Sequence, residues 1–177
     1  MRIALIAAPF IAVPPPEYGG TELFVGQLAE GLSKAGVDAV VYANGESTVQ
    51  AERRWLYERS MWPIKQPERA WLRELNHTSW AVRDALRDCD IIHMQSPQGL
   101  AFSHFVDRPF ILTLHGPHED FLSEYYVRYP EVQYVCISDA QCRKESLPHQ
   151  RTIHHGIDLS LYRLVENKQQ YLSFIGR

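Results

Sequence analysis

Short strand-like runs that alternate with helical segments are the feature that most constrains the fold of this chain. The runs lie at 2–8, 38–43, 90–95, 110–115, 132–137 and 151–157, with a further short strand near 53–57 in the less regular segment 44–66. Helical patterns are predicted at 21–35, 67–88, 98–106, 119–128 and from 138 onward. Strands that alternate with helices form parallel sheets whose two faces are covered by helices. We therefore predict an α/β fold with a Rossmann-like parallel sheet.

The ends of three predicted helices carry residues that commonly begin or end helices. Gly36 follows the amphipathic segment 21–35 and suits the left-handed conformation found after many helices. Pro67 suits the first turn of the long helix. Ser138 precedes Gln141 by three residues, which is the spacing of a capping box. The long helix is expected to pack through an apolar stripe, whose residues are Trp71, Leu72, Leu75, Val82, Ala85 and Leu86.

Composition and charge exclude several classes of protein. The chain has 177 residues, of which 45% are hydrophobic, and a formal net charge of −3, which is typical of a soluble globular protein. It has no block rich in lysine or arginine, so we expect no nucleic-acid partner. Pro9 interrupts the apolar run 1–13, which favours a buried first strand over a signal peptide. No apolar stretch is long enough to span a bilayer, so we expect a cytoplasmic protein.

Three cysteines, Cys89, Cys136 and Cys142, lack the C-x-x-C spacing of zinc and redox sites. Two of them flank or lie within strand-like runs. We expect free, buried thiols in a reducing compartment.

The loop PPPEYGGTE at 14–22 combines three prolines with adjacent glycines just before a helix. Gly19 and Gly20 let the backbone approach a ligand closely, and the helix N-terminus that follows favours a phosphate. The prolines restrict the loop before binding and so lower the entropy cost of ordering it. The alternative is a turn that merely requires glycine.

Other polar residues also follow predicted strands, where open parallel sheets bind their ligands. They are His93, Gln95, the segment His115 to Glu119, Ser138, and the segment His155 to Asp158. Each has a structural alternative: a satisfied core histidine for His93, a strand-end histidine bonded to backbone for His115, a helix cap for Ser138 and a turn for Asp158. His115 and His118 have an HxxH spacing, with His154 and His155 nearby, but HxxH pairs in loops arise by chance and we expect no metal.

Six stretches, in this order, resemble the family-4, retaining glycosyltransferases of the GT-B fold. They are PPPEYGGTELFVGQLAEGLSKAGVDAVVYA (14–43), DIIHMQ (90–95), FILTLHG (110–116), YVCISDAQ (134–141), IHHGIDLSLY (153–162) and YLSFIGR (171–177). The resemblance implies two Rossmann-like domains that face each other across a cleft. Residues 1–165 would form the N-terminal, acceptor-side domain, and 166–177 a linker and the first strand of a C-terminal donor-binding domain absent from this chain.

The resemblance also implies roles for individual residues. Gly19 and Gly20 would bind the diphosphate of a nucleotide-sugar donor, and His115 would be the catalytic residue beside the transferred hexosyl group. The 9–18 loop would help form the acceptor side. The acceptor- and sugar-binding residues would be Tyr18, Thr21, Glu22, His93, His118, Glu119, Ser138, His155 and Asp158. Transfer would retain the anomeric configuration, and no cofactor or metal would be needed.

One departure from the family pattern is His155, which stands where the family usually has asparagine before the glycine. Without a donor domain, this chain alone is expected to be inactive. The missing domain would be supplied in cis or by a separate chain, and peripheral membrane association would belong only to the full enzyme. The alternative function is a non-catalytic module that binds a carbohydrate or a partner. A Rossmann dehydrogenase or epimerase is disfavoured, because those enzymes place G-x-G-x-x-G directly after the first strand.

Overall fold

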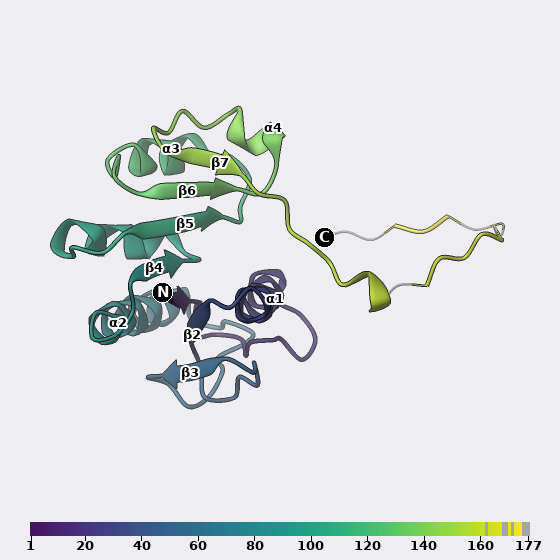
Figure 1. Cartoon of the computed structure of the whole chain (residues 1–177), viewed down its shortest axis with the longest axis horizontal. Coiled ribbons are helices and arrows are strands. Elements are labelled where there is room, and N and C mark those ends of the chain that lie inside the picture. Colours follow the sequence, from purple (N-terminus) through teal and green to yellow (C-terminus); the bar gives the residue numbers. More distant parts are fainter. Residues whose placement is uncertain (162, 168–169, 171, 175–177) are drawn as a thin grey trace.

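The computed structural model describes residues 1–161, 163–167, 170 and 172–174, and it contains a seven-stranded sheet (Figure 1). All strand pairs are parallel, and the strand order is β3-β2-β1-β4-β5-β6-β7. The strands are β1 (Arg2–Ile6), β2 (Asp38–Ala43), β3 (Glu52–Trp55), β4 (Ile91–Met94), β5 (Phe110–Leu114), β6 (Gln133–Cys136) and β7 (Gln150–Thr152). The predicted Rossmann-like parallel sheet is confirmed.

Strands β2 and β3 lie on one side of β1, and strands β4 to β7 lie on the other side. The order in which strands are added to the sheet therefore changes side between β1 and β4. Leu5, for example, lies opposite Val41 of β2 and His93 of β4. In open parallel sheets such a reversal leaves a crevice beyond the carboxyl ends of the two central strands. The fold therefore places any ligand site at the edge where β1 and β4 end.

Helices cover both faces of the sheet (Figure 1). They are α1 (Gly20–Lys34), α2 (Pro67–Ala85), α3 (Asp120–Tyr126) and α4 (Asp139–Cys142), with 3-10 helices η1 (Pro97–Phe105) and η2 (Leu159–Leu161). Alternate residues of a strand point to opposite faces. Accordingly, Leu5 of β1 shares one core cluster with Val25 of α1, whereas Ile6 shares the other with Val82 of α2.

The predicted helix ends are confirmed by hydrogen bonds. Gly36 has a φ of 75°, and its N–H donates to the Ser33 carbonyl (3.0 Å). The N–H of Val37 donates to the Leu32 carbonyl (2.9 Å). Together these are the two bonds of a Schellman motif. At α4, the Ser138 hydroxyl accepts from the N–H of Gln141 (3.2 Å).

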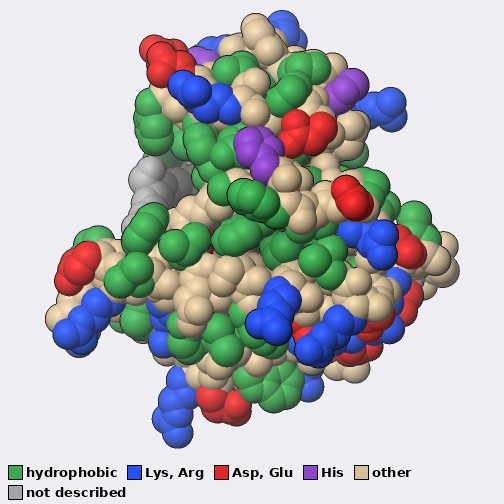
Figure 2. All heavy atoms as spheres, turned by 90° about the vertical axis from the view of Figure 1, so that its left-hand side faces the viewer, with side chains coloured by type: hydrophobic (Ala, Val, Ile, Leu, Met, Phe, Trp, Pro, Cys, Tyr) green, Lys and Arg blue, Asp and Glu red, His purple; other side chains and the backbone are tan. Residues whose placement is uncertain are grey.

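The predicted apolar stripe of α2 is only partly correct. Val82 and Ala85 are buried, but Trp71 and Leu72 are 53% and 59% exposed. Residues of α2 that are buried against the sheet and loops are instead Ala70, His77, Thr78, Ala81, Val82 and Ala85. The buried face therefore includes His77 and Thr78 beside the alanines, while Trp71 and Leu72 are left on the surface. Figure 2 shows the face that lies on the left of Figure 1, where hydrophobic side chains are interspersed with charged ones.

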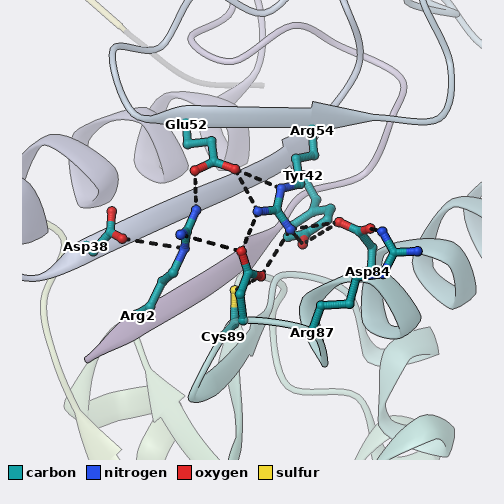
Figure 3. A network of polar contacts seen from close by, with 9 residues as sticks. Arg2, Asp38, Tyr42, Glu52, Arg54, Asp84, Arg87 and Cys89 are labelled. Atoms are coloured by element: carbon teal, nitrogen blue, oxygen red, sulfur yellow. Dashed lines mark hydrogen bonds and ion pairs between the residues drawn. The ribbon is translucent and has the colours of Figure 1, made fainter.

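A network of charged side chains runs along the first three strands (Figure 3). Arg2, Asp38 and Glu52 begin these strands, whereas Arg54 lies in the second half of β3, beside Tyr42 of β2. Arg54 of β3 contacts Asp84 (2.9 Å) and Asp88 (2.6 Å), and the hydroxyl of buried Tyr42 donates to Asp84 (3.0 Å). Arg2 forms ion pairs with residues that include Glu52. Hydrogen bonds from Arg54 to these carboxylates, Asp88 above all, raise the pKa of its guanidinium despite partial burial. The network ties α2 to the sheet on the edge opposite to the crevice.

Two sequence expectations concern the later part of the chain. The segment 151–157 is predicted to hold a last strand and a turn; the strand is β7, which ends at Thr152, and the residues from 153 to 160 are exposed. The predicted strand at 171–177 falls largely on residues outside those described, so the domain boundary at 165–166 stays a prediction.

Two smaller expectations can be compared directly with the structure. All three cysteines are free, with Cys89 and Cys136 buried as predicted and Cys142 half-buried. In the described part of the chain, no helix combines the length and apolar character needed to cross a membrane.

Candidate functional site

Most of the candidate residues lie just beyond the carboxyl ends of strands, at one edge of the sheet. The glycine loop follows β1, Gln95 follows β4, His115 follows β5, and His155 follows β7. The shared edge was predicted from sequence, and the structure adds which of these residues touch one another.

The two glycines of the loop have different structural roles. Gly19 is buried with a φ of 150°, and a Cβ there would lie 2.8 Å from Oε2 of Glu22 and 2.9 Å from Cβ of Pro15. Only glycine fits this position. Gly20, by contrast, begins α1, is exposed, and has no atom within 4 Å of a Cβ placed on it. The glycine-requiring turn is therefore at Gly19, and Gly20 leaves the helix start open.

The first turn of α1 combines backbone donors with a buried carboxyl group. The first helical hydrogen bond runs from the N–H of Leu23 to the Gly19 carbonyl (2.9 Å). The amides before Leu23 have no acceptor within the helix, as at every helix start. Glu22 folds back toward Gly19, is 8% exposed, and has its pKa raised by burial. Thr21, between them, is half-buried.

His115 lies at the centre of a cluster that joins three loops to α1. Its Nε2 is 2.8 Å from Oε1 of Gln95. The Phe24 ring meets its imidazole edge-on at 5.1 Å between centroids and stacks on His155 at 4.2 Å. The two imidazoles are 5.5 Å apart. Burial, then the proximity of His155 and His93, lowers the pKa of His115 to about 4, so the ring is neutral at pH 7.

His93 has the role of a satisfied core residue. It is 8% exposed, and its Nε2 lies 2.8 Å from Oγ1 of Thr113 on the neighbouring strand β5. Burial lowers its pKa to about 4. Its predicted contact with a sugar would require that bond to be exchanged, and it stays a prediction.

His118 belongs to a separate cluster. Its Nδ1 is 2.8 Å from Oε1 of buried Glu145, and its Nε2 is 3.2 Å from Oδ1 of Asp120. The Ser123 hydroxyl donates to the other oxygen of Glu145 (2.6 Å). Bonding to Glu145 is the main cause that raises the pKa of His118. His115 and His118 thus have different partners, and within the described ranges no three His, Cys, Asp or Glu side chains are grouped to hold a metal ion.

Three further candidates have local structural roles. Ser138 caps α4, which is the structural alternative predicted for it. Asp158 accepts hydrogen bonds from the N–H (2.9 Å) and the hydroxyl (2.7 Å) of Ser160 in a turn. Glu119 is exposed and precedes the first residue of α3. These contacts leave their proposed roles in ligand binding as predictions.

A groove of about 440 Å³ lies beside the proline loop. Tyr18 is half exposed and stacks on Trp62, with ring centroids 5.5 Å apart and planes 17° from parallel. Both rings line the groove, as do Glu17 and Glu46. The 9–18 loop therefore forms one wall of a concave surface with aromatic and polar groups.

Sequence reasoning missed the roles of Phe24 and Gln141. Phe24 lies in the amphipathic segment predicted as a helix, and no sequence signal indicates its contact with His155. Gln141 was identified as a capping residue, but its Nε2 also donates to the carbonyls of Leu114 (3.0 Å) and Gly116 (2.6 Å). It therefore holds both sides of His115 in place.

Comparisons with solved structures find proteins of the same fold. Sucrose-phosphate synthase from Thermosynechococcus elongatus has a TM-score of 0.68 at 17% identity, over 93% of this chain and 50% of that protein. HepE from Anabaena, solved with UDP and glucose, has 0.60 at 16%, over 93% and 47%. AviGT4, a glycosyltransferase of avilamycin A biosynthesis, has 0.52 at 20%, over 92% and 44%. The chain thus spans about half the length of these proteins.

A search among curated proteins finds no match to the sequence. The family model for Glycosyltransferase Family 4, however, matches residues 18–161. That range includes Gly19 and Gly20, here called the glycine corner, together with His115 and His155, and it extends over most of the chain. With a fold shared by GT-B glycosyltransferases, the chain belongs to glycosyltransferase family 4.

Proposed function

We propose that this chain is the acceptor-side part of a retaining hexosyltransferase that uses a nucleotide-diphosphate sugar. The observation that carries the proposal is the open helix start at Gly20, on the edge of the sheet where neutral His115 also lies. The backbone amides there can donate to the donor diphosphate. HepE, of the same fold, was solved with UDP and glucose, which agrees with a donor of this class.

The groove beside the proline loop is the proposed acceptor side. Aromatic rings such as the Tyr18–Trp62 pair offer apolar faces to a sugar ring, and carboxylates can accept from its hydroxyls. In the reaction, the acceptor hydroxyl would bond to the anomeric carbon as its bond to the leaving phosphate breaks. The hydroxyl proton would pass to that phosphate, on the same face of the sugar, with retention. No cofactor or metal is needed in this scheme.

We further propose that a donor-binding domain completes the enzyme. Residues 166–177 would lead into this domain if it lies in cis; otherwise a separate chain would supply it. The 177-residue chain alone would then lack most of the contacts to the nucleotide and would be inactive. The complete enzyme would act in the cytoplasm, with membrane association only peripheral.

The test is glycosyl transfer by the full-length protein with a panel of UDP- and GDP-hexoses. We expect a product with the donor's anomeric configuration by NMR, at a rate that EDTA does not change. An inverted product would contradict retention, and the absence of transfer and of donor hydrolysis across the panel would favour a non-catalytic binding module.

Gly20→Val tests the diphosphate role in the same assay. Because a side chain at Gly20 meets open space, the variant should fold normally while turnover falls by two orders of magnitude or more. Gly20→Ala, which adds only one methyl group, is the matched control and should lose less. Wild-type turnover by Gly20→Val would disprove that the diphosphate approaches this corner. His115→Ala should likewise lower transfer far more than it lowers the melting temperature.

A further inference from the structure

Gln95 is a buried residue, and within the described part of the chain only one of the two polar atoms of its side-chain amide has a hydrogen-bond partner. It follows β4, its backbone N–H donates to the Ile6 carbonyl (3.2 Å), and the residue is 7% exposed. Its Oε1 faces Nε2 of His115 at 2.8 Å. Its Nε2, although fully buried, has no hydrogen-bond partner among the residues that the structure describes.

The bonded half of the amide determines which nitrogen of His115 carries a proton. An amide oxygen can only accept, so the Nε2 of His115 must be the donor. With the ring neutral, Nδ1 then keeps its lone pair and can only accept. His115 is thereby prepared to receive a hydrogen bond from a substrate hydroxyl.

The unbonded half of the amide points to a ligand. A buried amide N–H without an acceptor is costly, and such groups in native proteins call for a specific explanation. Gln95 and His115 both line a cavity of about 190 Å³. This is several times the space of one water molecule, which occupies about 30 Å³ in the liquid. The wall also includes the carboxyl-bearing Glu145, so an uncharged hydroxyl suits the cavity better than a phosphate.

We propose that Gln95 is a substrate-binding and positioning residue of the transferase site: its Oε1 holds His115 as the Nε2–H tautomer, and its Nε2 donates to a hydroxyl of the transferred sugar. This inference rests on the proposed glycosyltransferase function. A hydroxyl of the sugar would then be the acceptor that the buried Nε2 of Gln95 lacks among the described residues.

The positioning role is tested without any substrate. Long-range ¹H–¹⁵N NMR of the full-length protein at neutral pH should show His115 as the neutral Nε2–H tautomer, and Gln95→Leu should change that signature. Gln95→Glu keeps the accepting oxygen and places a carboxylate beside the ring, so the pKa of His115 should rise. Exposed Gln133 on β6 is the matched control, and Gln133→Glu should leave the His115 spectrum unchanged. An Nδ1–H tautomer or an imidazolium in the wild type would overturn the positioning role.

The substrate contact is tested by kinetics with the donor that the panel identifies. Gln95→Glu keeps the shape of the side chain but loses the N–H donor, so kcat/KM should fall at least tenfold. The comparison of monodeoxy donors separates this loss from the change in the pKa of His115. Among monodeoxy donors, one should show no further loss in Gln95→Leu, because it lacks the hydroxyl that Nε2 binds. If Gln95→Leu does not fold, the kcat/KM values of the monodeoxy donors are compared in Gln95→Glu instead.

The outcomes separate this inference from the function on which it rests. Wild-type kinetics in Gln95→Glu, in an enzyme that transfers sugar, would overturn the sugar contact alone. A wild-type protein that transfers no sugar from any donor would overturn the proposed function and the sugar contact together, while the NMR experiment would still decide the tautomer.

Discussion

The ring of Phe24, on the first helix, stacks on the imidazole of His155, beyond the last strand, at 4.2 Å between centroids and 22° between planes. One contact therefore joins the start of α1 to a segment far along the chain. His155 is also the residue that departs from the asparagine usual in the family. Although the residue is exposed, desolvation of its ring lowers its pKa, which favours the neutral ring in this stack.

Replacement of Phe24 tests whether this stack holds the site together. Phe24→Ala should reduce the free energy of unfolding by about 1–2 kcal/mol, from lost aromatic contact and buried area. The ring-proton signals of His155, shifted by the stacked phenyl group, should move toward their ordinary positions in NMR spectra. Leu23→Ala, at the exposed neighbouring position, is the control. Unchanged His155 signals in Phe24→Ala would show that the stack is absent in solution.

The two glycines of the corner should respond oppositely to alanine. Gly19→Ala forces a side chain into a positive-φ position against Pro15 and Glu22, and should cost about 2–4 kcal/mol of stability. Gly20→Ala should be neutral or slightly stabilising, because alanine favours a helical first turn. Urea denaturation measures both. Equal losses at the two positions would contradict the distinct roles given to them.

The charged network at the opposite edge should contribute to stability but not to catalysis. Arg54→Met removes hydrogen bonds to Asp84 and Asp88 and should cost about 1–3 kcal/mol, with part of the effect screened by solvent. Arg87→Met breaks only a pair on an exposed arginine and should cost less than about 1 kcal/mol. The full-length Arg54→Met enzyme, once folded, should retain its kcat/KM. A large loss of kcat/KM would link this edge to the active site.

His118 should make stability depend on pH near neutrality. Glu145 and then Asp120 raise its pKa in the folded state above the ordinary value of 6.5. The charged form therefore stabilises the fold fully below about pH 6.5, and this contribution is lost as the pH rises through the folded-state pKa. Burial lowers the pKa of His77, His93 and His115, which makes stability change with pH in the opposite sense, so the His118 contribution is measured as a difference between proteins. The melting temperature of the wild type minus that of His118→Gln should be largest at acidic pH and should shrink as the pH rises through the folded-state pKa of His118, while exposed His149→Gln should behave as wild type. An identical pH profile in His118→Gln would show that His118 carries no such charge.

Local patterns predicted the fold well because its elements obey local rules. The strand at 38–43 was predicted at its observed bounds, and Gly36 ends α1 with the expected conformation. The face of α2 was predicted less well, since apolar residue type alone does not show that polar His77 and Thr78 are buried together with its alanines. Trp71 therefore lies on the surface although its type favours burial.

The candidate site was predictable in its location but not in its pairings. Sequence order placed His115 and Gln95 at the ends of neighbouring strands, and parallel strands bring such ends together. The partner of His118 could not be foreseen, because Glu145 is 27 residues away and lies beyond α4. The stack of Phe24 on His155 likewise depends on how the segment after β7 passes α1.

The separation of the charged network from the glycine corner has a consequence for protein engineering. Since every strand runs in the same direction, the connections on one edge can be exchanged while the Arg2–Arg54 anchor on the other edge is kept. Chimaeras that transplant the proline loop or the segment after β5 from a related enzyme should thus retain the parent's thermal tolerance.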